Sequence, residues 1–121
     1  MKLFRTEDFI SIENPTPGKP YRLEILTAEG KAQDLGGILG LLPPGIPGTL
    51  HYHKRRESIL FIISGEGVEL VDDKETPIRA GDILFIPPGE KHTVLNRSDK
   101  EIRYLEFFTY PPVAADFVAV E

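Results

Sequence analysis

Hydrophobic residues along this 121-residue chain occur in short segments, and glycine, proline and aspartate separate these segments at nearly even intervals. Clusters such as SGEG, DDKE and PPGEK are typical of turns, and no window is long and periodic enough for a core helix. Many short strands between regular turns are typical of a sandwich or barrel. We therefore predict an all-β, antiparallel protein with strands at residues 21–26, 37–42, 49–53, 58–63, 67–71, 76–79, 82–86, 92–96 and 102–110.

Two of the apolar segments are continuous instead of alternating. Residues 38–42 read ILGLL and residues 59–63 read ILFII. A strand with one solvated face alternates between apolar and polar positions, whereas a strand covered on both faces does not. We therefore expect both segments to be buried on both faces.

The two ends of the chain differ from its middle. Three prolines within residues 15–20 make the first segment a poor continuation of a barrel. We predict an N-terminal arm and edge strand over residues 1–32, a barrel over 33–110 and a C-terminal tail over 111–121. The tail is either a final strand or a loose extension. An arm that crosses to a second subunit could cover an exposed sheet edge, so we expect a homodimer, the alternative being an arm that folds back on its own sheet.

Composition narrows the range of partners and compartments. The net charge is −5, and the one basic run, Lys54-Arg55-Arg56, is too short to make a nucleic-acid footprint. The chain has no cysteine, which excludes disulfides and thiolate ligands and fits a reducing cytoplasm. Its first residues, MKLFRTEDFI, do not resemble an export signal, and no apolar run approaches the roughly 20 residues of a membrane helix. We expect a cytoplasmic protein with no membrane or nucleic-acid partner.

The chain contains three histidines, and two of them, His51 and His53, flank Tyr52. Residues two apart on a strand point to the same face, so this pair could form half of a metal site. His92 is the remaining histidine and could complete the site if it faces the same interior. The alternative is that these side chains are only hydrogen-bonded in a core or lie on an exposed strand.

The segment GDILFIPPGEKHTVLN, residues 81–96, adds a pattern around the third histidine. It fits G-x5-P-x-G-x2-H-x3-N, with the fixed positions at Gly81, Pro87, Gly89, His92 and Asn96. A plain hairpin would explain the glycines and prolines, which suit tight turns, but not the histidine and asparagine at fixed offsets. The pattern resembles the second motif of the cupin superfamily.

The segment GIPGTLHYH, residues 45–53, resembles the first half of the other cupin motif, G-x5-H-x-H. Its second half departs from the family pattern, in which a glutamate ligand precedes a glycine by six intervening residues. Here Glu57 is separated from Gly65 by one residue too many, and Ser58 occupies the usual carboxylate position. Either Glu57 reaches the metal through a one-residue bulge or the carboxylate is absent. We favour a site of three histidines: His51, His53 and His92.

The resemblance implies a small single-domain cupin, a double-stranded β-helix or jelly-roll barrel that holds one divalent transition metal. Imidazole ligands suit Fe, Zn, Ni, Cu or Mn, and loss of the carboxylate disfavours Mn. Three protein ligands leave positions open for a substrate. Cupins with such sites include dioxygenases and isomerases, so we expect a metal-dependent enzyme acting on a small oxygenated metabolite. The alternative is a non-catalytic cupin that binds a small molecule or sugar; the segment LHYHKRRES resembles part of bacterial phosphomannose isomerases, in which case its basic run could engage an anionic substrate.

The last long strand should present alternate residues to opposite faces. Tyr104, Glu106 and Phe108 share one face, and residues 103, 105 and 107 share the other. One of these sets lines the pocket. A buried carboxylate is costly unless it is paired, so Glu106 becomes a candidate acid or base if its set faces inward. Asn96 is expected to order the turn that carries His92, either for the metal site or as a turn cap alone.

Overall fold

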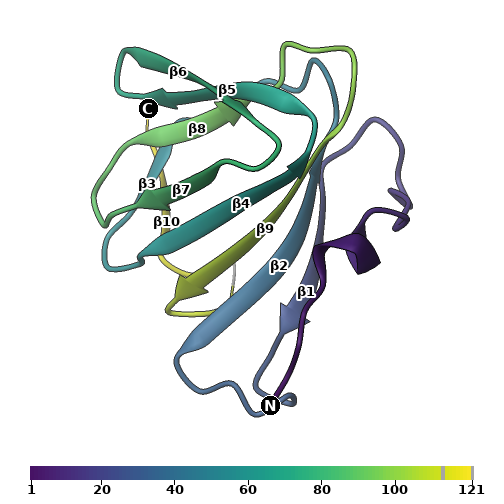
Figure 1. Ribbon diagram of the computed structural model, residues 1–121. Coiled ribbons are helices and arrows are strands. Elements are labelled where there is room, and N and C mark those ends of the chain that lie inside the picture. The colour runs from purple at the N-terminus through teal and green to yellow at the C-terminus, as the bar shows by residue number, and fades with distance from the viewer. Residues whose placement is uncertain (113, 121) are drawn as a thin grey trace.

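The computed structural model describes residues 1–112 and 114–120 and consists of two antiparallel sheets that face each other (Figure 1). Sheet A has the strand order β1-β2-β9-β4-β7, and sheet B has the order β10-β3-β8-β5-β6. The strands are β1 (Tyr21–Leu26), β2 (Leu35–Leu42), β3 (His51–His53), β4 (Ser58–Ser64), β5 (Glu66–Val71), β6 (Lys74–Arg79), β7 (Ile83–Ile86), β8 (His92–Leu95), β9 (Ile102–Thr109) and β10 (Phe117–Ala119). This is the double-stranded β-helix that the sequence motifs implied.

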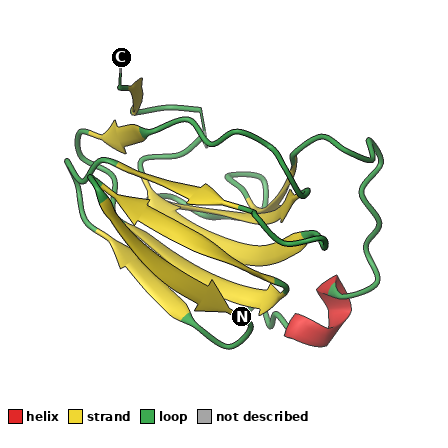
Figure 2. Cartoon of the chain, turned by 90° about the horizontal axis from the view of Figure 1, so that it is seen from above, coloured by secondary structure: helices red, strands yellow, loops and turns green. Residues whose placement is uncertain are grey.

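All nine expected strands are present, with ends shifted by at most two residues. A tenth strand, β10, lies in the C-terminal tail and pairs with β3, so of the two alternatives for the tail the structure has a final strand. One 3-10 helix, Thr6–Phe9, lies outside the strands (Figure 2). Within the described residues, no helix is long and apolar enough to cross a membrane.

The N-terminal arm folds back on its own sheet. Phe9 packs with Leu39, Leu41 and Leu105 in a buried cluster on the outer face of sheet A. Arg103 fixes the arm there, because its Nη1 donates to the backbone oxygens of Phe9 and of Ile12, both at 2.7 Å. The odd-numbered face of β9 therefore points to the arm, which leaves the even-numbered face for the interior.

The two continuous apolar segments differ in burial. In β2, residues 36–41 are buried, as predicted, because β1 and β9 flank the strand and the arm covers its outer face. In β4 the prediction is wrong at Ile59, whose side chain is 50% exposed. The arm packs against β1, β2 and β9, so the outer face of β4 near Ile59 lacks the second apolar layer that burial would require.

Candidate metal centre

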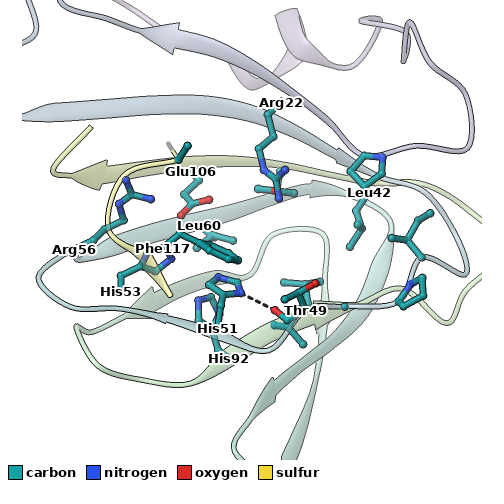
Figure 3. Close-up of a pocket in the computed structure, with 18 residues that line it drawn as sticks. Arg22, Leu42, Thr49, His51, His53, Arg56, Leu60, His92, Glu106 and Phe117 are labelled. Atoms are coloured by element: carbon teal, nitrogen blue, oxygen red, sulfur yellow. Dashed lines mark hydrogen bonds between the residues drawn. The ribbon is translucent and has the colours of Figure 1, made fainter. Parts of the chain in front are cut away.

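A pocket of about 650 Å³ opens between the two sheets and contains most of the polar side chains of the interior (Figure 3). Sheet B contributes all three histidines, and sheet A contributes Arg22, Tyr104 and Glu106. The other end of the interior is closed by an apolar cluster around Ile62, Ile78 and Ile102. The sandwich therefore has one packed end and one end suited to a ligand.

The three histidines meet on one wall of this pocket. His51 and His53 alternate on β3, and His51 lies directly opposite His92 in the register of β3 and β8. One nitrogen from each ring lies within 4.8 Å of the other two. Among the residues that the structure describes, this is the one group of histidine, aspartate and glutamate side chains with the spacing of a metal site.

Hydrogen bonds orient each of the three rings. The Nδ1 atoms lie near oxygen atoms: Thr49 O at 2.7 Å for His51, Asp116 O at 3.0 Å for His53, and Glu69 Oε1 at 2.7 Å for His92. Because a carbonyl or carboxylate oxygen accepts, each Nδ1 carries the proton and donates it. Each Nε2 then keeps its lone pair, which is the tautomer that a metal ligand needs.

Burial keeps two of the rings neutral. Desolvation, together with the charges of the neighbouring histidines and of Arg22, lowers the pKa of His51 to about 4, against the opposing effect of the hydrogen bond to Thr49. Desolvation also lowers the pKa of His53, with the charge of Arg56 acting in the same direction. A neutral imidazole is the form that binds metals, so the pocket holds these side chains ready for a ligand role.

Glu57, the candidate fourth ligand, and Ser58, at the family's usual carboxylate position, lie in different places. Glu57 is exposed and lies outside the histidine cluster, and its backbone N–H donates to Thr109 Oγ1 at 3.0 Å. Ser58 is buried, and its hydroxyl lies beside the carboxylate of Glu106, where it lowers the pKa of that carboxyl group. Glu106 comes from β9 and lines the same pocket as the histidines, so the carboxylate of the pocket belongs to a different strand from the one in the motif.

The environment of Glu106 contains opposing influences. Burial raises the pKa of its carboxyl group, while the hydrogen bond from Ser58 and the charge of Arg56 lower it. The side chain points toward the space between Arg56 and Leu60 in the view of Figure 3. The even-numbered face of β9 therefore supplies the pocket with both Glu106 and Tyr104, one of the two alternatives for this strand.

The three side chains of the basic run, residues 54–56, differ in burial. Lys54 and Arg55 are exposed, whereas Arg56 is 2% exposed and packs its guanidinium 4.4 Å above the ring of Phe108. The Arg56 guanidinium also donates to three backbone oxygens at the end of β9 and just after it: those of Thr109 at 3.1 Å, Tyr110 at 2.9 Å and Pro112 at 2.7 Å. Arg56 therefore fastens the C-terminal segment to the barrel.

The C-terminal segment also contributes to the histidine site, and sequence reasoning did not identify these residues. Asp116 accepts from the backbone N–H groups of Arg55 and Arg56 at 2.7 and 2.9 Å, and its carbonyl holds His53. Phe117 stacks on His51 with ring centroids 4.5 Å apart. The tail carries no pattern that indicates this role, because the contacts depend on the pairing of β10 with β3.

Two further polar residues lie close to the site: Glu69, which the sequence reasoning missed, and Asn96, which it named. Glu69, buried beside His92, was not identified, although a glutamate within the apolar strand EGVELV is the kind of signal that could have found it. Asn96 donates from Nδ2 to the backbone oxygens of Leu42 and Lys100 at 2.9 and 2.7 Å. It orders the turn after β8 and makes no hydrogen bond to His92, in line with the turn-cap alternative.

Comparisons with known proteins agree with this architecture. The family model described as a cupin domain matches residues 38–108. A protein from Klebsiella pneumoniae with a double-stranded β-helix domain superposes with a TM-score of 0.76 at 23% identity, over 100% of this chain and 98% of that one. A predicted oxalate decarboxylase from Thermotoga maritima gives a TM-score of 0.66 at 24% identity, over 91% of this chain and 100% of that one.

Sequence similarity to curated proteins is confined to part of the chain. The Oxalate-binding protein of Thermotoga maritima is 39% identical over 64 residues, which are 53% of each protein. The alignments span little more than half the length of the curated relatives. The matched family region contains both histidine motifs and most of β2 and β9. The chain therefore belongs to the cupin family.

Proposed function

We propose that this cupin binds one divalent transition metal ion through His51, His53 and His92 and is a metal-dependent enzyme for a small oxygenated anion. The single observation that carries the proposal is the orientation of the three rings, each held through Nδ1 so that Nε2 is available. Hydrogen bonds of this kind fix the rings of metal-bound histidines.

The donor set fits such an ion. Three neutral imidazoles suit Fe, Zn, Ni or Cu better than Mn, which prefers oxygen ligands. Three protein ligands leave coordination positions for a substrate, whereas a structural site is closed by four. When bound, the ion would supply Lewis acidity or redox chemistry to a substrate oxygen.

Glu106 is the residue that we expect to move a proton. It reaches the pocket from sheet A, opposite the histidines on sheet B, and the hydroxyl of Ser58 lies beside its carboxylate. A ligand between the sheets would contact both groups. Phe117 and Leu60 line the same space and would limit the access of water to a bound substrate.

The substrate class is inferred from the charges of the pocket and from the names of similar proteins. Two cations, Arg22 and Arg56, line the pocket, and they would favour a carboxylate-bearing compound. One similar protein is named as oxalate-binding and another as a predicted oxalate decarboxylase. The first name also favours the second candidate function, a cupin that binds a small carboxylate without converting it.

The test combines metal analysis with turnover. Untagged wild-type protein should contain nearly one equivalent of a transition metal, and His92→Ala and His51→Ala should lose it, while Tyr52→Phe should retain it. Turnover of oxalate and of small 2-oxo and 2-hydroxy acids is then measured with Glu106→Gln alongside. An enzyme should lose about 100-fold or more of its kcat in this variant while keeping its metal.

Two results would contradict the proposal at different points. A wild-type protein that neither contains a metal nor takes one up on reconstitution excludes the metal site. A protein that binds metal and carboxylates but converts none of them favours the binding function. Retention of full activity by Glu106→Gln would remove the proton-transfer role of that residue alone.

A further inference from the structure

Arg22 is a charged side chain of the pocket that the metal site does not use. It lies on β1, outside the residues matched by the family model, and it is exposed to the solvent of the pocket. Figure 3 shows it extending from the sheet A side toward His51 and Thr49. Within the described part of the chain, no carboxylate forms an ion pair with it.

The position of Arg22 is set by a row of residues across sheet A. Arg22 on β1 pairs with Gly40 on β2, which pairs with Tyr104 on β9. A Cβ at Gly40 would lie 2.1 Å from Cζ of Tyr104, so the tyrosine ring occupies the space above this glycine. The row therefore brings the hydroxyl of Tyr104 beside the guanidinium of Arg22, which lowers the pKa of that hydroxyl against the larger effect of burial.

The two groups together form a donor pair. Burial raises the pKa of Tyr104 to about 12, so the hydroxyl keeps its proton at neutral pH. A tyrosine hydroxyl that accepts from a guanidinium can still donate its own proton. The planar guanidinium presents several N–H groups in a geometry that matches a carboxylate or phosphate.

Glu106, the carboxylate that lines the pocket, does not form an ion pair with Arg22. Glu106 lies beside Ser58, and Arg56 lowers the pKa of its carboxyl group more strongly than Arg22 does. Arg56 is buried and committed to the C-terminal segment. Arg22 therefore remains as the cation oriented toward a ligand, on the opposite wall from the histidines.

We propose that Arg22 and Tyr104 form an anion subsite that binds the far end of a substrate whose near end lies against the histidines. The ligand class is a small organic anion with an oxygen-bearing group at one end and a carboxylate or phosphate at the other. A pocket of about 650 Å³ has room for such a molecule. The inference rests on the proposed function for the near end of the ligand, and it makes Arg22 a specificity-determining residue.

The experiment uses pairs of probes that differ in one anionic group. Succinate is compared with butyrate to test a carboxylate, and phosphoglycolate is compared with glycolate to test a phosphate. Affinities are measured by calorimetry on the intact protein in its metal-bound form. The variants are Arg22→Met, which keeps the apolar stem, Arg22→Lys, which keeps the charge, and Tyr104→Phe, which keeps the ring above Gly40. Arg79→Met removes an exposed arginine outside the pocket and serves as the control.

We expect wild-type protein to bind the doubly anionic member of at least one pair about tenfold or more tightly than the singly anionic member. Arg22→Met should remove this preference and leave the affinity for the singly anionic probe within about twofold. Tyr104→Phe should weaken the preference, and Arg22→Lys should retain part of it. The pair with the larger loss identifies the anionic group as carboxylate or phosphate.

The inference is overturned if wild-type protein shows no preference in either pair, or if Arg22→Met keeps the preference. Equal losses for both members of a pair would also overturn it, since they would reflect damage to the whole pocket. If Arg22→Met does not fold, Arg22→Lys and Tyr104→Phe still test the subsite, because an undiminished preference for the second charge in both variants would overturn the inference. Metal content is measured on every sample: if wild-type protein holds no metal, the proposed function fails, while the preference for the second charge can still be measured on the metal-free protein.

Discussion

Glu69 and His92 form the most buried polar contact of the candidate site. Their side chains are 6% and 8% exposed, and their oxygen and nitrogen atoms are 2.7 Å apart. A carboxylate behind a metal-binding histidine fixes the ring and increases its basicity. At the residue scale, the affinity of the site for a metal would therefore depend on Glu69, which would not contact the metal itself.

Replacing Glu69 by alanine should weaken metal binding by about 10- to 100-fold, because the ring of His92 loses its acceptor. Glu69→Gln should lose less, since the amide oxygen can still accept. Competition with a chromogenic chelator measures the affinity, and Glu66→Gln, an exposed position on the same strand, is the control. Unchanged affinity in Glu69→Ala would show that ring orientation does not depend on this contact.

The lowered pKa values of His51 and His53 predict how stability depends on pH. Both rings are kept neutral in the folded protein, so the unfolded chain binds more protons below its histidine pKa of 6.5. Stability then falls as the pH falls from 6.5 toward the pKa of about 4 for His51. The thermal midpoint of metal-free protein should decrease across this window, and the decrease should be shallower in His51→Asn. A midpoint that is constant or rises on acidification would contradict the expectation.

At the element scale, β10 completes the histidine site from outside the matched family region. Its first residue stacks on His51, the preceding carbonyl holds His53, and Arg56 binds the loop that leads to the strand. The position of the strand thus depends on one buried guanidinium and on Asp116. Loss of the guanidinium should affect both stability and metal binding.

Arg56→Met should lower the free energy of unfolding by about 2 to 3 kcal/mol, because three carbonyl oxygens at the end of β9 and in the following loop lose their donor. It should also weaken metal binding, since the loop that leads to Asp116 would lose its attachment to the barrel. Arg55→Met is a matched neighbour: its side chain is exposed and lies over Tyr110, so the loss should stay below about 1 kcal/mol. Denaturant titration and metal competition measure the two effects. Equal stability of the two variants would refute the fastening role of Arg56.

At the scale of the whole molecule, the outer face of sheet A is covered only in part. The arm packs over β1, β2 and β9, while Ile59, Ile83 and Phe85 on β4 and β7 are 50%, 67% and 58% exposed. These three side chains are neighbours, since Ile59 pairs with Phe85 and the next row contains Ile83. β7 is also the edge strand of the sheet. An apolar patch at a sheet edge is a typical contact surface between subunits.

We therefore expect a homodimer that buries this patch, in contrast to an arm-mediated dimer. Phe85→Glu should convert the dimer to a monomer, because a charge would be placed in the interface without a partner. Light scattering coupled to size exclusion gives the mass, and Thr76→Glu adds the same charge on the exposed edge strand β6 as a control. A wild-type monomer, or a dimer that persists in Phe85→Glu, would exclude this interface.

The sequence alone determined the strands β1 to β9, the fold class and the histidines of the candidate site. Strands and turns depend on local periodicity and on glycine and proline, and the spacing of His51 and His53 fixes their common face whatever the partner strands are. Only the tertiary structure decided which carboxylates lie near the histidines, because strand pairings far apart in sequence bring Glu69 to His92 and Glu106 into the pocket. The same reason applies to Arg22, Arg56 and Phe117. Their contacts are with residues far away in the sequence, which no local pattern specifies.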